Sequence, residues 1–181
     1  MSLTFAPDTH IILPEVHRQA ILGHCNRALA AHRNGRAEEG KAFGLVSGTV
    51  LGQVITVAGS FPLQKNVRSQ APYKEYMDRT MEEHAVASVT PLDQRGWVAE
   101  PAELFARIKE CRSNGQILIG TYHVHKVGWE RDTLRDTPTR LDTVLAQGSG
   151  LLMFIISMVD PARPIIRAFY EGITAREIVL Q

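Results

Sequence analysis

The nine residues from Ile117 to His125 read Ile-Leu-Ile-Gly-Thr-Tyr-His-Val-His, an apolar run that ends in two histidines. The apolar residues from Ile117 to Ile119 favour a buried strand. Side chains two apart on a strand point to the same face, so His123 and His125 should lie together at its end. Two imidazoles in this position supply half of a tetrahedral zinc site, and a carboxylate further along the chain would supply a third ligand. The alternative is that both histidines only pack against the strand end or cap it.

The surrounding sequence predicts a mixed α/β (α+β) domain. Apolar residues at helical spacing predict helices, and short apolar runs between turn residues predict strands. The expected helices span residues 13–32, 101–114 and 138–146, and the expected strands span residues 42–50, 51–58, 116–125, 151–159, 165–170 and 176–180. For the helix at 138–146, Thr137 is the expected N-cap and Pro138 the first helical residue. Residues 151–159 are nearly all apolar, which is typical of a central strand covered on both faces. We therefore expect a mixed central sheet flanked by helices.

The composition is that of an ordinary globular protein. The 181 residues fit one domain spanning 1–181, and 44% of them are hydrophobic while 22% are charged. The formal net charge of +1 argues against a nucleic-acid partner and against an anionic membrane surface. The sequence leaves formation of a homo-oligomer open.

The two cysteines and the N-terminus indicate a reducing compartment. Cys25 and Cys111 lie in helix-like segments without a CxxC partner, which suits small buried hydrophobic residues better than a disulfide framework. The chain opens without the basic and apolar regions of a signal peptide, and its apolar runs are too short to span a membrane. We therefore expect a cytoplasmic protein.

The order of these parts resembles the JAMM/MPN (JAB) family of metallopeptidases. In that family a Gly-x-Tyr-His-x-His strand is followed by a loop, a Pro-[Ser/Thr]-x-x-Asp helix start and an apolar strand, which match residues 120–125, 138–142 and 151–156 here. The run Phe43-Gly44-Leu45-Val46-Ser47-Gly48 is similar to the family's Gly-Leu-x-x-Gly strand. The likeness extends over residues 13–170 and implies a JAB/MPN-like domain with a cytidine-deaminase-like fold.

The resemblance implies a zinc site formed by His123, His125 and Asp142, with a fourth position left for water. In the family the zinc lowers the pKa of that water and polarises the scissile carbonyl, while a glutamate transfers the proton. The resemblance also implies that Thr139 helps to hold the oxyanion. The alternative for Thr139 is an ordinary position in the first turn of a helix.

The family's usual spacing allows a second aspartate as the third ligand. Counted from His125, that spacing puts the hydroxyl residue at Thr133 and the aspartate at Asp136. We prefer Asp142 because a proline and a threonine open a helix in front of it, whereas Asp136 stands just before a proline and suits a loop. Residues 126–137 then form an insertion over the site, beginning with Lys126 where the family commonly has proline.

The catalytic glutamate of the family is replaced in this chain. It stands three residues before the glycine of the Gly-Leu strand, and that position is Lys41. A lysine cannot act as a carboxylate base unless its pKa is strongly lowered. Glu39 has the same strand parity, so a register shift or bulge would bring it to the water, and we predict Glu39 as the base. The alternative is that Glu38 and Glu39 form a solvated turn and the site is inactive.

Three functional hypotheses follow from this site. The first is a zinc-dependent metallopeptidase or isopeptidase of JAMM type that acts on the C-terminal tail of a ubiquitin-like or sulfur-carrier protein. The second is a catalytically inactive MPN-like domain that binds a protein partner. The third, more weakly indicated, is a zinc amidohydrolase for small molecules. We expect residues 68–96 and 126–137 to clamp an extended peptide tail, since binding residues concentrate on loops.

Overall fold

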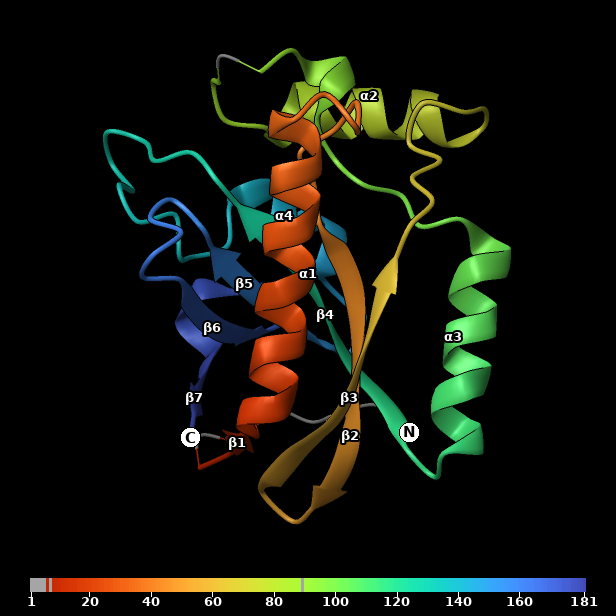
Figure 1. The fold of residues 1–181 in the computed structure, drawn as a ribbon, viewed down its shortest axis with the longest axis vertical. Helices are drawn as coiled ribbons and strands as arrows, with labels where there is room; N and C mark the ends of the chain where they lie inside the picture. The colour runs from red at the N-terminus through yellow and green to blue at the C-terminus, as the bar shows by residue number, and fades with distance from the viewer. Residues whose placement is uncertain (1–5, 7, 89) are drawn as a thin grey trace.

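The structure is a computed structural model that describes residues 6, 8–88 and 90–181. Its strands are β1 (His10–Ile12), β2 (Phe43–Leu51), β3 (Val54–Leu63), β4 (Ile117–His125), β5 (Leu152–Ser157), β6 (Ile165–Tyr170) and β7 (Glu177–Leu180). Its helices are α1 (Glu15–Arg33), α2 (Tyr73–His84), α3 (Pro101–Ser113) and α4 (Arg140–Ala146), with short 3-10 turns at Leu92–Gln94 and Thr174–Arg176. Figure 1 shows α1 running along the strands, while α2 lies beyond one end of them.

The seven strands form a closed mixed barrel in the order β1-β3-β2-β4-β5-β6-β7. Strand β1 pairs in parallel with both β3 and β7 and thereby joins the two edges of the sheet. The predicted α/β fold, a helix-flanked central sheet of JAB/MPN (cytidine-deaminase-like) type, is therefore wrong. Strand β1 has only three residues and its partners lie far away in the sequence, so hydrophobic periodicity could not reveal the closure.

Most of the individual elements are confirmed by the structure. The predicted helices over 13–32 and 101–114 appear as α1 and α3, and each of the six predicted strands is present. The start of α4 differs from the prediction, because Thr139 rather than Thr137 is the N-cap. The described part of the chain contains no helix of the length and apolar character that a bilayer crossing requires.

Alternation along β4 divides its side chains between two environments. Tyr122 is buried in the main hydrophobic cluster, together with Ile21 and Cys25 of α1 and Phe154 of β5. Because neighbouring residues of a strand face opposite ways, the side chain of His123 lies on the other face. On that other face a smaller apolar cluster of β5 and β6 packs against Ala146 of α4. The barrel wall thus separates the α1 core from the histidine face.

Tyr122 is fixed in place by contacts from two directions. Its hydroxyl forms a hydrogen bond with Nδ1 of His24 at 2.7 Å, which joins β4 to α1. Its ring lies over Gly44 of the neighbouring strand, where a methyl carbon added to the glycine would come within 2.3 Å of the ring carbon Cε1. Only glycine at position 44 leaves room for this aromatic ring.

We expect Gly44→Ala to lower the free energy of unfolding by about 1–3 kcal/mol, since the added methyl group overpacks the core against Tyr122. Gly23→Ala in α1 is a matched control, because its methyl group meets only the flexible Arg27 side chain, at 3.2 Å. The control should gain up to about 1 kcal/mol from helix propensity. Urea unfolding of the three proteins measures both effects, and a Gly44→Ala protein as stable as the wild type would contradict the packing described here.

Candidate metal centre

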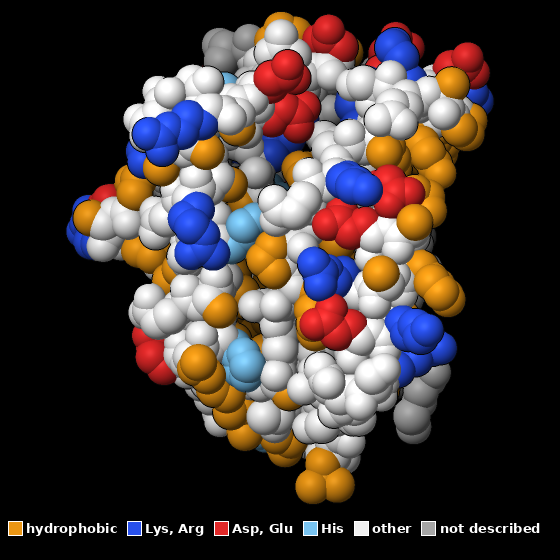
Figure 2. Space-filling model, turned by 45° about the vertical axis from the view of Figure 1, so that its right-hand side comes forward, with side chains coloured by type: hydrophobic (Ala, Val, Ile, Leu, Met, Phe, Trp, Pro, Cys, Tyr) orange, Lys and Arg blue, Asp and Glu red, His pale blue; other side chains and the backbone are white. Residues whose placement is uncertain are grey.

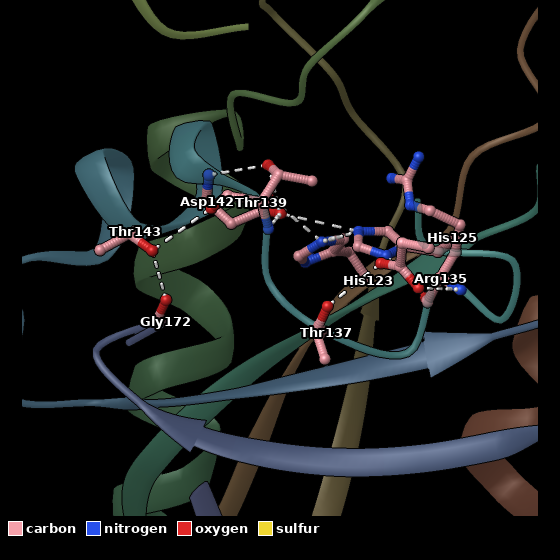
Figure 3. Close-up of polar contacts among 9 residues, drawn as sticks. His123, His125, Arg135, Thr137, Thr139, Asp142, Thr143 and Gly172 are labelled. Carbon is pink, nitrogen blue, oxygen red and sulfur yellow. Dashed lines mark hydrogen bonds and ion pairs between the residues drawn. The ribbon is translucent and has the colours of Figure 1, made fainter. Parts of the chain in front are cut away.

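Three side chains from two elements converge on the histidine face. His123 and His125 end β4, and Asp142 stands in the first turn of α4. The two Nε2 atoms lie 3.0 Å apart, His123 Nε2 lies 3.4 Å from Asp142 Oδ1, and His125 Nε2 lies 3.7 Å from Asp142 Oδ2. The possible ligand atoms of all three residues lie within 4.8 Å of one another. Figure 3 shows both imidazole rings facing Asp142.

The protonation states of this cluster suit a cation. Burial lowers the pKa of both His123 and His125, and the nearby positive charge of Arg135 acts in the same direction. Burial by itself would raise the pKa of Asp142, but the histidines and the hydrogen bonds from Thr139 outweigh it, so this pKa is lowered. Near neutral pH the cluster therefore offers neutral imidazoles and an ionised carboxylate, the forms that bind metal ions.

The orientation of His125 is set by a backbone carbonyl. Nδ1 of His125 lies 2.9 Å from the carbonyl oxygen of Arg135, which can only accept a hydrogen bond. The proton of a neutral His125 must therefore reside on Nδ1, which leaves a lone pair on Nε2. Metal-binding histidines commonly have such a partner on the second nitrogen.

The orientation of Asp142 comes from the capping box at the start of α4. The backbone N–H and the hydroxyl of Thr139 both donate to Asp142 Oδ2, each at 2.7 Å, and the Asp142 N–H donates to the Thr139 hydroxyl at 3.2 Å. A threonine hydroxyl has one proton, and here that proton is directed to Asp142. In this arrangement Thr139 positions the carboxylate, and its hydroxyl proton is not free for an oxyanion.

The cluster opens into a cavity of about 660 Å³. Aromatic side chains form one side of it: the Phe43 ring stacks on Trp97 at 5.8 Å and on His123 at 6.3 Å between ring centroids. The predicted clamp segments 68–96 and 126–137 both contribute residues to the lining. A molecule larger than water can therefore reach His123, His125 and Asp142 through this cavity.

Lys41 lines this cavity, whereas the predicted base Glu39 does not appear among the lining residues that the structure describes. Glu39 accepts hydrogen bonds from Lys41 Nζ at 2.9 Å and from Asn66 Nδ2 at 3.0 Å. The structure therefore does not bring Glu39 together with the histidines and Asp142. The neighbouring Glu38 is exposed.

The sequence also points to Asp136 and Lys126. Asp136 pairs with Arg167 Nη1 at 3.1 Å and is not part of the histidine cluster. Lys126 lines the cavity directly after the second histidine. The structure thus brings Asp142, rather than Asp136, to the side chains of His123 and His125.

Sequence reasoning missed Arg135 and Trp129. Both line the cavity, and the Arg135 guanidinium carbon lies 3.2 Å from the centroid of the Trp129 ring. The loop that carries them was predicted to lie over the site, but one arginine among scattered basic residues carries no distinguishing pattern. The importance of Arg135 becomes visible only once the loop is folded.

The fold is similar to that of known solved structures, among them the following two. A protein of Desulfitobacterium hafniense, determined in solution, is similar with a TM-score of 0.63 and 21% identity, over 94% of this chain and 91% of the other. A protein of Salinibacter ruber, also determined in solution, gives a TM-score of 0.54 and 19% identity, over 94% and 90% of the two chains. No family profile and no curated protein matches the sequence. The comparisons thus support the fold and leave the function to the chemistry of the site.

When zinc is added, we expect the wild type and Asp136→Asn to bind one ion per chain and Asp142→Asn to bind none, because Asp142 and not Asp136 reaches the histidine nitrogens. The two substitutions are matched, since each replaces an oxygen by an amide nitrogen without changing side-chain size. Elemental analysis of the purified proteins, with His123→Ala as a second ligand variant, measures the effect. Loss of zinc in Asp136→Asn together with retention in Asp142→Asn would contradict this ligand set.

Thr139→Val should weaken zinc binding roughly 10- to 100-fold, the usual cost of losing an outer hydrogen bond to a ligand. Thr139→Ser keeps the hydroxyl and should bind zinc like the wild type. Competition with a chromogenic chelator gives the affinities, and thermal melting of the zinc-free proteins separates the loss of the helix cap from the loss of metal binding. Equal affinities in the valine and serine variants would show that the hydroxyl does not position Asp142.

Proposed function

We propose that this protein is a zinc-dependent peptidase or isopeptidase of JAMM type, acting on the C-terminal tail of a ubiquitin-like or sulfur-carrier protein. The observation that carries the proposal is the convergence of His123, His125 and Asp142 at the cavity. Two histidines with one carboxylate form a common donor set for catalytic zinc. A zinc ion bound there would supply a Lewis acid that activates water and polarises a carbonyl at neutral pH.

The protein's own groups support this proposal through orientation and charge. The Arg135 carbonyl holds His125 in the required tautomer, and Thr139 directs the carboxylate of Asp142. His123 is held from one side by the stacked ring of Phe43. A site whose ligands are fixed before the metal binds loses less conformational freedom on binding.

Hydrolysis also requires a group that accepts a proton from the attacking water. Asp142 is the only carboxylate among the described residues that line the cavity, and the proposal employs it as a ligand. Glu39 is the proposed acceptor, and it must first release Lys41 Nζ and Asn66 Nδ2 and turn toward the cavity. Both side chains of the Lys41–Glu39 ion pair are partly exposed, so this pair contributes only about 0–1 kcal/mol.

The same geometry favours a second candidate, a protein-binding domain without hydrolytic activity. Here the Lys41–Glu39 pair is permanent, and the cation beside the cavity takes the place of the base. Such a domain would bind the same tail and leave it intact. Both candidates bind the same tail, but only the peptidase cleaves it.

An extended peptide suits the shape and charge of the molecule. The lining includes Tyr73, Tyr76 and Met77 from α2, and Val127 and Trp129 from the loop that follows β4. On the face in Figure 2, lysine and arginine side chains are interspersed with acidic ones, without the continuous basic surface that nucleic acids require. We also propose a reducing compartment such as the cytoplasm, in keeping with the free, buried Cys25 and Cys111.

Incubation of the zinc-loaded protein with small ubiquitin-like proteins that carry C-terminal extensions should release the extension after the final glycine, as read by mass spectrometry. Glu39→Gln should reduce kcat by about 10²- to 10⁴-fold, the usual contribution of a general base, without changing zinc content. Glu38→Gln is the matched control, because the Glu38 side chain is exposed and Lys41 Nζ donates to Glu39 instead.

Undiminished turnover in Glu39→Gln would remove this residue as the base. If the wild type binds the tails but cleaves none of them, the binding domain is the better description, and Lys41→Glu is then the variant to test for gain of turnover. Cleavage of small amides alone would instead indicate a small-molecule amidohydrolase.

A further inference from the structure

The side chain of Arg135 contains a buried nitrogen, Nε, without a hydrogen-bonding partner. The residue is 8% exposed, and its Nε is fully buried with no acceptor. Within the described ranges, no carboxylate or carbonyl accepts a hydrogen bond from this side chain, which lies against the face of Trp129. Buried arginines are normally paired, since removing the charge from water is costly. The arrangement indicates that a partner is supplied from outside.

The backbone of Arg135 is held in an uncommon conformation beside the metal cluster. Its φ is +49°, in the left-handed region that non-glycine residues seldom adopt. Its N–H donates to Asp132 Oδ1 at 2.8 Å, and its carbonyl accepts from Nδ1 of His125 at 2.9 Å. Strained residues of this kind persist where surrounding contacts hold them, often at binding sites. The carbonyl of this residue thus orients a candidate ligand (Figure 3), and the same residue lines the cavity.

The loop that carries Arg135 is itself well supported. Trp129 and Asp132 form a bridge with hydrogen bonds of 3.0 and 3.2 Å, and Thr137 Oγ1 donates to Asp132 Oδ2 at 3.1 Å. The hydroxyl of Ser157 in β5 donates to the carbonyl of Leu134 and ties the loop to the barrel. These contacts hold the guanidinium against the tryptophan ring, so little ordering is left for a ligand to impose.

The charges around the cavity point to an anionic ligand. Of its charged lining residues, four are cations and one is an anion: Lys41, Arg95, Lys126 and Arg135 against Asp142. Burial lowers the pKa of Arg135, and the negative charges of Asp142 and Asp132 oppose this shift. Neither carboxylate accepts a hydrogen bond from the Arg135 guanidinium, since Asp132 accepts only from the backbone N–H of Arg135 and Asp142 accepts from Thr139. A ligand that carries a negative charge would be attracted into this cavity and would complete the unpaired guanidinium.

We propose that Arg135 binds the terminal carboxylate of the peptide, so that the tail accepted by this site ends within the cavity. Arg135 lines the cavity, and its guanidinium carbon lies 3.2 Å from the centroid of the Trp129 ring. A guanidinium held in this way can form the bidentate contact by which arginine recognises a carboxylate. The inference rests on the proposed function for the identity of the ligand as a peptide. It adds a substrate class: short C-terminal extensions with a free carboxylate, rather than internal bonds of a long chain.

Binding and cleavage are measured separately. Isothermal titration calorimetry of the zinc-loaded protein compares N-acetyl-Gly-Gly with its C-terminal amide, and we expect the acid to bind at least about tenfold more tightly, as one charged hydrogen-bonded pair would provide. Arg135→Met should reduce this ratio to about one, whereas Arg135→Lys should retain part of it because an ammonium cannot form the bidentate contact. Lys126→Met removes another cation from the same lining and should keep the wild-type ratio.

Two further measurements separate the alternatives. Zinc content is determined for each variant, because the Arg135 carbonyl also holds His125 and a change in metal occupancy would confuse the comparison. A third peptide, N-acetyl-Asp-Gly amide, carries its carboxylate on a side chain. This peptide is compared with N-acetyl-Gly-Gly amide. Tighter binding of the aspartate peptide, with equal binding of N-acetyl-Gly-Gly and its amide, would show that Arg135 binds an acidic side chain and would overturn the proposal that it binds the terminal carboxylate.

The proposal and the peptidase function fail in different ways. Equal binding of acid and amide by the zinc-loaded wild type overturns the role of Arg135 and leaves the peptidase proposal intact. A preference for the acid that persists in Arg135→Met also overturns it, since the metal itself would then bind the carboxylate. An Arg135-dependent preference in a protein that cleaves no peptide supports the anchor while the hydrolytic function fails.

Discussion

The alternation of side chains along β4 is the constraint on which the rest of the structure depends. Tyr122 faces the α1 core, where its ring is excluded from solvent and its hydroxyl joins His24. Its neighbour His123 must then face the opposite side, together with His125. A slip of one residue would bury the imidazoles against α1 and expose the tyrosine to the cavity. The free energy of core packing therefore also fixes the direction of the candidate ligands.

The start of α4 shows how an ordinary helix cap becomes part of a functional site. The capping box between Thr139 and Asp142 would stabilise a helix in any protein. Here Leu141 packs against Met77 and Met81 of α2, so the orientation of the helix is fixed by apolar contacts. The free carboxylate oxygen Oδ1 then lies 3.4 Å from His123. The position of the carboxylate results from both the local cap and the distant packing.

Charge is distributed unevenly between the surface and the cavity. The whole chain has a formal net charge of +1, and its surface mixes both signs (Figure 2). The cavity concentrates cations around one carboxylate, with the unpaired Arg135 beside the histidines. Pairing this arginine with a fixed acid of the protein would have stabilised the empty state and weakened ligand binding. The arrangement favours a site in which the ligand supplies the acceptor for Arg135.

The sequence by itself determined the local elements and the paired histidines, because periodicity and turn chemistry act over a few residues. The strand at 165–170, the helix whose C-cap is Asn114 and the shared face of His123 and His125 all follow from such short-range rules. Tertiary structure decided the closure of the barrel through three residues of β1, the pairing of Glu39 with Lys41, and the position of Arg135 over Trp129. The barrel closure depends on contacts between segments that lie far apart in the sequence and leave no periodic signal. The other two depend on which of several partners a flexible side chain reaches. Such contacts exist only after the chain has folded.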